Sequence, residues 1–193
     1  MIGASTGGTR ALKDVLDNLP DVIPPILIVQ HIPAEFSRAF AERLDQSVKF
    51  SVKEAEDGDL VVPNQVLVAP GGTQMKFIHR GGLMKVEIND DAPVSRFKPS
   101  VDYLFSSVAK SSVEKNIVAA IFTGMGKDGA ESMQLLKKMK NASTIAQDEA
   151  SSVVFGMPKE AIKLGCVDKI VPLSESASTL MDFCRVSVEK KAQ

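Results

Sequence analysis

The sequence predicts an α/β fold: a doubly wound, mostly parallel sheet with helices on both faces, forming three layers, plus an antiparallel β-hairpin. Short apolar runs typical of strands buried on both faces recur along the chain, and amphipathic helical patterns lie between them. This alternation implies right-handed crossovers, which place helices on both sides of the sheet. The 193 residues fit a single domain, 1–193.

The N-terminal part of the chain predicts the first two strand–helix units. Only Met1 and Ile2 precede the glycine-rich turn Gly3–Gly8. The first strand is therefore shorter than the usual ~5–6 residues, and we expect the chain to be a segment of a longer protein. Apolar residues at helical spacing follow over 12–19 and 36–44, and the apolar run Ile26–Gln30 between them predicts a buried parallel strand.

The rest of the chain continues the alternation. Further buried strands are predicted at Val66–Ala69, Ile117–Phe122 and Val167–Val171, and helices over 101–108 and 177–188.

One segment departs from this pattern. Met75–Arg80 and Leu83–Ile88 flank the dipeptide Gly81-Gly82, whose residues can take the positive φ angles of a tight turn. We expect an antiparallel hairpin there, with His79 on it as a surface or cross-strand residue.

Charge and apolar patterning exclude several function classes. Lys and Arg number 23 against 24 Asp and Glu, a net charge of −1, with no block of like charge to bind phosphate backbones. We therefore expect no nucleic-acid partner. No apolar run approaches the ~20 residues that a membrane span needs, and no signal peptide opens the chain. These features predict a cytoplasmic protein with no direct membrane insertion.

Metal chemistry is not expected either. The two cysteines, Cys166 and Cys184, and the two histidines, His31 and His79, match no metal-binding spacing. We expect buried free thiols, no metal site and no cofactor.

Ser5 lies in a pattern that suits a nucleophile. Gly3–Gly7 matches G-x-S-x-G, in which a serine occupies a sharp strand-to-helix turn between small neighbours. The backbone N–H groups that follow would open a helix and point toward an anion. The same residues could equally form a plain N-cap turn or a phosphate-binding loop, so the pattern alone leaves these alternatives open.

Two further polar residues follow predicted parallel strands. His31 comes directly after Ile26–Gln30, at the strand end where open α/β sheets build their sites, although a lone histidine there could simply cap the turn before Pro33. Asp128 lies in the glycine-rich turn after the strand that ends at Phe122. With Glu131 it also has the spacing of a capping box, which would make it a helix N-cap.

The combination is more specific than its parts. A serine, a histidine and an aspartate each follow a different strand at one sheet edge, as a nucleophile, a general base and an orienting carboxylate require. Their chain order Ser5, His31, Asp128 differs from the Ser, Asp, His order of α/β-hydrolases, so that family is disfavoured. Asp148, in a polar stretch, and Asp57, in a loop, are poorer candidates.

Several motifs together resemble the CheB-type chemotaxis protein-glutamate methylesterases over nearly the whole chain. They are Gly3–Gly8, Gln30–Pro33, Ala69–Gly72, Pro99–Asp102 and Thr123–Ala130. The resemblance implies a catalytic domain that removes methyl groups from glutamyl methyl esters on the cytoplasmic helices of chemoreceptors. It also implies that the domain deamidates receptor glutamines.

The resemblance also implies roles for individual residues. Ser5 matches the family's nucleophile, His31 its general base and acid, and Asp128 the carboxylate that orients the imidazole. An oxyanion site is implied at backbone N–H groups including that of Met125, and the elbow geometry makes Thr6 the natural second donor.

Other parts of the family pattern are missing or changed. The family normally carries an N-terminal receiver domain that covers the active-site face until it is phosphorylated, and this domain is absent from the chain. Gln74 stands where a histidine is expected, and Phe97-Lys98 where a basic pair is commoner. These departures affect the expected substrate contacts.

Two rival functions are testable. In a nucleotide-binding module, Gly3–Gly8 would grip a phosphate, although the acidic residue expected for the ribose is replaced by Gln30-His31. This version predicts thermal stabilisation by ATP or NAD. A general serine esterase for small esters would instead hydrolyse p-nitrophenyl acetate rapidly.

Overall fold

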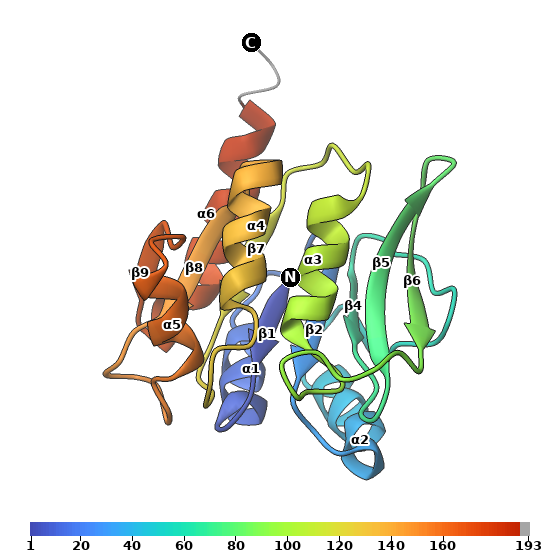
Figure 1. Cartoon of the computed structure of the whole chain (residues 1–193), viewed down its shortest axis with the longest axis horizontal. Coiled ribbons are helices and arrows are strands. Elements are labelled where there is room, and N and C mark those ends of the chain that lie inside the picture. The colour runs from blue at the N-terminus through green and yellow to red at the C-terminus, as the bar shows by residue number, and fades with distance from the viewer. Residues whose placement is uncertain (190–193) are drawn as a thin grey trace.

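The computed structural model describes residues 1–189, and the side chains of residues 1–185. A seven-stranded sheet forms its centre in the order β3-β4-β2-β1-β7-β8-β9, and every neighbouring pair is parallel (Figure 1). The strands are β1 (Ile2–Ala4), β2 (Ile26–Gln30), β3 (Ser51–Glu54), β4 (Gln65–Val68), β7 (Val118–Ile121), β8 (Ser143–Gln147) and β9 (Lys169–Val171). The predicted doubly wound α/β class is confirmed.

Helices cover both faces of this sheet. One core cluster joins it to α3, α4 and α5, and a second joins it to α1, α2 and α6. The helices are α1 (Gly8–Asp17), α2 (Ala34–Asp45), α3 (Val101–Lys110), α4 (Ala130–Lys140), α5 (Met157–Lys163) and α6 (Leu173–Glu189). Val188, in the helical pattern over 177–188, lies in α6, but its side chain is outside the described part.

Strand β2 shows why the central strands have continuous apolar sequences. Leu27 and Val29 face one core cluster, while Ile26 and Ile28 face the other. Successive side chains of a strand point to opposite faces, so both faces need apolar residues when both are covered.

The expected hairpin is present as a separate two-stranded antiparallel sheet of β5 (Gln74–Arg80) and β6 (Leu83–Asn89). Gly81 and Gly82 have φ angles of 60° and 78°, as a tight two-residue turn requires. The hairpin lies along α3 (Figure 1), and the Phe77 N–H donates to the Ser107 hydroxyl across 2.8 Å. His79 pairs across the strands with Met84, as expected.

Some elements were not expected. β3 and β8 were missed because polar residues interrupt them, and α4 and α5 were not singled out. Cys166 is a buried free thiol as predicted, but Cys184, which was also expected to be buried, is only half-buried. None of the helices described over residues 1–189 is long and apolar enough to span a bilayer.

Candidate active site

The parallel sheet brings the three candidate residues to one edge. Ser5 follows β1 and His31 follows β2, while Asp128 lies in the loop between β7 and α4. These strands are adjacent in the order β2-β1-β7, and all point the same way. The chain reverses its winding direction next to β1, which is where open α/β sheets place their sites.

Ser5 is held on the sharp turn that the glycine pattern predicts. Its N–H donates to the Thr123 carbonyl across 3.0 Å, and the Gly8 N–H donates back to the Ser5 carbonyl across 2.7 Å. Gly7 has a φ of 81°, and a Cβ on it would lie 2.6 Å from the Cβ of Val153. The turn therefore needs glycine at position 7 for both its conformation and its packing.

Gln30 ties the serine loop to the histidine loop. Its Nε2 donates to the Ser5 carbonyl across 2.9 Å and to the His31 carbonyl across 3.0 Å. Its Oε1 is buried without a hydrogen-bond partner. Sequence reasoning missed this role, and the available signal was an amide as the last residue of an apolar strand.

His31 and Asp128 are in direct contact. The distance from His31 Nε2 to Asp128 Oδ2 is 2.8 Å, and the two side chains are 9% and 0% exposed. Because both side chains are buried, the electrostatic attraction between them is stronger than at the surface. The capping-box alternative for Asp128 is wrong: α4 has Gly129 as its N-cap, with no side-chain cap, because the Asp128 carboxylate points toward α3 instead.

The N-terminus of α3 holds the Asp128 carboxylate. The Ser100 hydroxyl donates to it across 2.8 Å, and the N–H groups of Val101 and Asp102 donate across 2.7 and 3.0 Å. Burial alone would raise the pKa of Asp128, but these donors and His31 outweigh it and lower the pKa below its ordinary value. Asp128 is therefore an anion with four donors.

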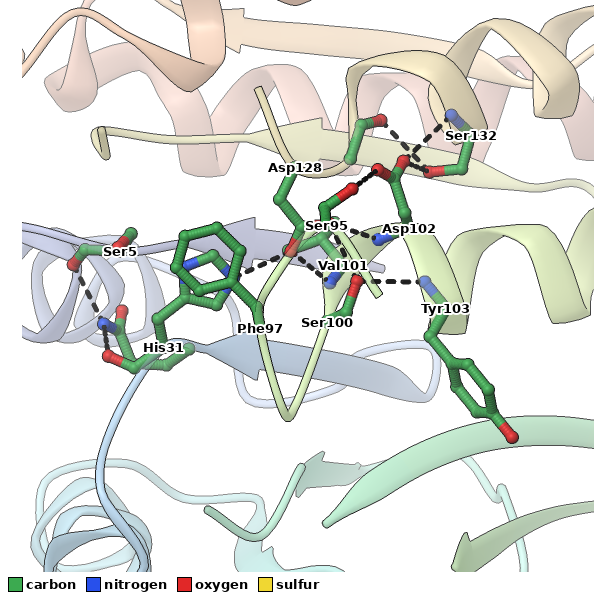
Figure 2. A network of polar contacts seen from close by, with 12 residues as sticks. Ser5, His31, Ser95, Phe97, Ser100, Val101, Asp102, Tyr103, Asp128 and Ser132 are labelled. Atoms are coloured by element: carbon green, nitrogen blue, oxygen red, sulfur yellow. Dashed lines mark hydrogen bonds and ion pairs between the residues drawn. The ribbon is translucent and has the colours of Figure 1, made fainter. Parts of the chain in front are cut away.

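The two imidazole nitrogens of His31 have different surroundings. Nε2 faces Asp128, while Nδ1 is buried and has no hydrogen-bond partner among the side chains and backbone described for this chain. Ser5 lies on the side of the imidazole away from Asp128 (Figure 2). In the familiar serine-protease triad the carboxylate contacts Nδ1, so here the two nitrogens are exchanged. With Nε2–H donating to the carboxylate, Nδ1 is the free acceptor.

Asp102 is a second carboxylate beside the first, and sequence reasoning missed its role. It accepts hydrogen bonds from the Ser132 hydroxyl at 2.7 Å, the Ser132 N–H at 3.1 Å and the Ser95 hydroxyl at 3.1 Å. Burial raises the pKa of Asp102, the Ser132 hydroxyl lowers it, the charge of Asp128 raises it, and the net pKa is raised.

Of the two residues expected to supply oxyanion donors, Thr6 follows β1 and Met125 lies in the loop after β7. The Gly124 N–H donates to the Val154 carbonyl across 3.0 Å, and the Gly124 carbonyl accepts from Met157 N–H across 2.8 Å, which holds the loop beside Ser5. Within residues 1–189 the N–H groups of Thr6 and Met125 donate to no protein acceptor.

The two departures from the family pattern lie next to these residues. Phe97 stacks on the His31 imidazole, with ring centroids 3.7 Å apart and an interplanar angle of 7° (Figure 2). Gln74 is fully buried and bonds to the loop that carries Phe97. Lys98 instead pairs with Asp90 at the surface.

The other titratable candidates lie outside this cluster. Asp148 accepts from the Ser151 N–H across 2.9 Å, and Asp57 accepts from the Ile88 N–H across 3.0 Å. Over the described residues 1–189, no three His, Cys, Asp or Glu side chains gather in a way that could hold a metal ion.

The fold and these residues define a class: doubly wound α/β domains that bring a serine, a histidine and an aspartate to the carboxyl edge of the sheet. Within that class the chain belongs to the CheB methylesterase family, whose model matches residues 1–180. The resemblance noted from the motifs is thereby confirmed.

Individual relatives agree with this assignment. The chain is 53% identical over 180 residues to the protein-glutamate methylesterase/protein-glutamine glutaminase of group 3 operon of Bradyrhizobium diazoefficiens, covering 93% of the chain and 49% of the relative. It is 50% identical over 180 residues to the protein-glutamate methylesterase/protein-glutamine glutaminase of Salmonella typhi, covering 93% and 51%. The chain thus spans about half the length of these curated relatives.

A solved structure covers nearly the whole chain. The Thermotoga maritima CheB methylesterase catalytic domain superposes with a TM-score of 0.89 at 36% identity, over 94% of this chain and 95% of that one. The sheet and its helices therefore match the fold of a catalytic domain.

Proposed function

We propose that this chain is a serine hydrolase that demethylates glutamyl methyl esters on the cytoplasmic helices of chemoreceptors, and that it also deamidates receptor glutamines. The observation that carries the proposal is the His31–Asp128 contact, with the unpartnered Nδ1 of His31 on the Ser5 side. Relatives named protein-glutamate methylesterase/protein-glutamine glutaminase support the substrate class.

In the first step, Nδ1 of His31 takes the proton of Ser5 as its Oγ attacks the ester carbonyl. The negative charge that develops on the carbonyl oxygen is stabilised by the N–H groups of Thr6 and Met125, which donate to no acceptor among residues 1–189. The C–O bond then breaks, and methanol leaves with the proton from His31. The product is a glutamyl ester of Ser5.

In the second step, His31 takes a proton from water, whose oxygen attacks the acyl carbon. The bond between this carbon and Ser5 Oγ then breaks, His31 returns the proton to Ser5, and the glutamate product leaves and ionises to its carboxylate. Deamidation follows the same course, with ammonia leaving in place of methanol. Asp128 remains ionised throughout because its donors lower its pKa. It holds the imidazole with Nε2 protonated and stabilises the cation that forms.

We further propose that the chain works in the cytoplasm with methylated chemoreceptors as partners. In this proposal an N-terminal receiver domain of the longer protein controls access to the active-site face. The length of the curated relatives, about twice that of this chain, supports an additional domain.

The test is methanol release from receptor-containing membranes that carry radiolabelled glutamyl methyl esters, with the Ser5→Ala variant as control. Release by the chain and none by the variant is expected. Equal release by both would exclude Ser5 as nucleophile. Rapid hydrolysis of p-nitrophenyl acetate without receptor demethylation would favour a general esterase, and thermal stabilisation by ATP or NAD would favour a nucleotide-binding module.

A further inference from the structure

We propose that Phe97 is a positioning residue for His31: its ring stacks on one face of the imidazole and holds it in the plane in which Nε2 meets Asp128 and Nδ1 is left for Ser5. This inference deepens the proposed function and rests on it for its kinetic consequence. The stacked geometry itself is independent of the substrate.

The hydrogen bonds of His31 do not by themselves fix the imidazole plane. Nε2 has one partner, Asp128 at 2.8 Å, and Nδ1 has none. An imidazole held by a single hydrogen bond at Nε2 can still rotate about its Cβ–Cγ bond. The Phe97 ring lies 3.7 Å away and is within 7° of parallel, so it blocks that rotation from one face.

Phe97 lies outside the core of the sheet. It is half-buried and belongs to neither of the two core clusters described for residues 1–185. Its ring instead stacks on the His31 imidazole.

The chain carries Phe97 on a tight turn of unusual conformation. Val94 and Phe97 exchange backbone hydrogen bonds, of 3.1 Å from the Val94 N–H and 2.9 Å from the Phe97 N–H. The central residues Ser95 and Arg96 have φ angles of 53° and 71°. Two-residue turns with positive φ at both positions favour Asn and Gly, so the surroundings must maintain this turn.

Gln74 supplies that restraint. It is fully buried, and its Nε2 donates to the carbonyls of Ala92 and Phe97, both across 3.2 Å. Its Oε1 accepts from the Ser100 N–H across 3.0 Å, and the Ser100 hydroxyl donates to Asp128. One buried amide therefore connects the loop that carries the stacked ring to the helix end that holds the carboxylate.

The direct test is the NMR spectrum of the imidazoles, which is simple because the chain has two histidines, and the His79→Gln variant assigns them. In the wild type and in Phe97→Tyr, ring-current shielding should move the His31 C–H signals upfield, and the neutral ring should show one tautomer, with the proton on Nε2. In Phe97→Leu these signals should move downfield and the tautomers should mix. The exposed Phe36, changed to Leu, serves as the spectral control.

A Phe97→Leu spectrum that keeps the wild-type shifts and the single tautomer would overturn the proposal. Gln74→Leu tests the restraint: we expect a loss of upfield shift in the same direction, since the loop is released. Unchanged His31 signals in this variant would exclude Gln74 from the positioning role.

Methanol release then measures the consequence for turnover. Phe97→Leu should lower kcat about tenfold, the scale of a misplaced catalytic group, with KM changed less than about twofold, and Phe97→Tyr should restore kcat. A raised KM at unchanged kcat would mean that the ring binds substrate, which contradicts a positioning role. Should the wild type release no methanol, the proposed function fails, while the imidazole spectra still decide whether Phe97 positions His31.

Discussion

The backbone N–H of Asp102 donates to the carboxylate of Asp128 across 3.0 Å, yet the side chains of these two residues have their pKa values shifted in opposite directions. Asp128 is fully buried and Asp102 is half-buried, and this desolvation raises the pKa of each. Asp128 accepts hydrogen bonds from His31, a hydroxyl and two backbone N–H groups, which bring its pKa below the ordinary value. Asp102 has fewer compensating donors and faces the charge of Asp128, so its pKa stays raised.

This difference predicts how the stability of an Asp102→Asn variant depends on pH. A carboxyl group whose folded pKa is raised favours folding least above that pKa, because the folded state resists its ionisation. Asn removes this cost while its Oδ1 can still accept from Ser132. Relative to the wild type, the variant should therefore gain stability as the pH rises from 3 to 7.

Urea unfolding of both proteins at several pH values measures this difference. The matched control is Asp57→Asn, since Asp57 accepts a single backbone hydrogen bond at the surface. A stability difference for Asp102→Asn that is the same at pH 3 and pH 7 would contradict the raised pKa.

The lowered pKa of Asp128 makes stability depend on pH in the opposite direction from Asp102. Its contribution to stability is full above the unfolded-state pKa and is lost as the pH falls through the folded-state pKa.

For activity, Asp128→Asn should reduce turnover by roughly 10⁴-fold, because an amide favours the wrong imidazole tautomer. Methanol release measures this, with Asp148→Asn as control. Turnover of Asp128→Asn near the wild-type value would remove Asp128 from the proposed triad.

Gln30 should matter for both loops that it joins. Gln30→Met keeps the length of the side chain but removes the donors to the Ser5 and His31 carbonyls. The Ser5 carbonyl then keeps only the Gly8 N–H, and the His31 carbonyl loses the Gln30 donor. We expect a loss of about 1–3 kcal/mol in the free energy of unfolding. Turnover should fall by about tenfold or more, because both reacting side chains shift.

Gln65→Met is the matched control. Gln65 is the first residue of β4 in the same sheet, and it too has a buried, unpartnered Oε1. Equal losses of turnover in the two variants would show that the Gln30 bridge has no particular role.

Substituting Gly7 and Gly58 in parallel distinguishes the cost of backbone strain from the cost of a packing clash. Their φ angles are 81° and 82°, but a Cβ at position 7 would lie 2.6 Å from Val153, whereas one at position 58 would meet nothing within 4 Å. Gly58→Ala should cost only the left-handed strain, about 1–2 kcal/mol. Gly7→Ala should cost more and should also lower turnover, because the Ser5 turn must move.

Thermal or urea unfolding compares the two variants. Adding Val153→Ala to Gly7→Ala should recover part of the excess loss, since it removes the Val153 Cγ2 methyl at 2.7 Å and leaves only the Cβ at 2.6 Å. Equal destabilisation by the two glycine substitutions would show that the contact with Val153 relaxes without cost.

Much of the fold followed from local patterns. The run Ile26–Gln30 predicted β2 with its observed bounds, because a strand covered on both faces needs apolar residues at every position. Gly81-Gly82 predicted the hairpin because of its φ angles. Strand β3 escaped prediction because it lies at the sheet edge, where Val52 is its buried residue and polar side chains are tolerated.

For the site, chain order and strand ends were enough to bring Ser5, His31 and Asp128 to one edge, since parallel strands all end at the same side of the sheet. Local spacing could not say whether Asp128 caps its own helix or faces α3. Nor could it show that Gln30 joins two loops or that Phe97 covers His31. Those contacts join residues far apart in the chain, and only the packing of the helices and loops on the sheet decides which side chains meet.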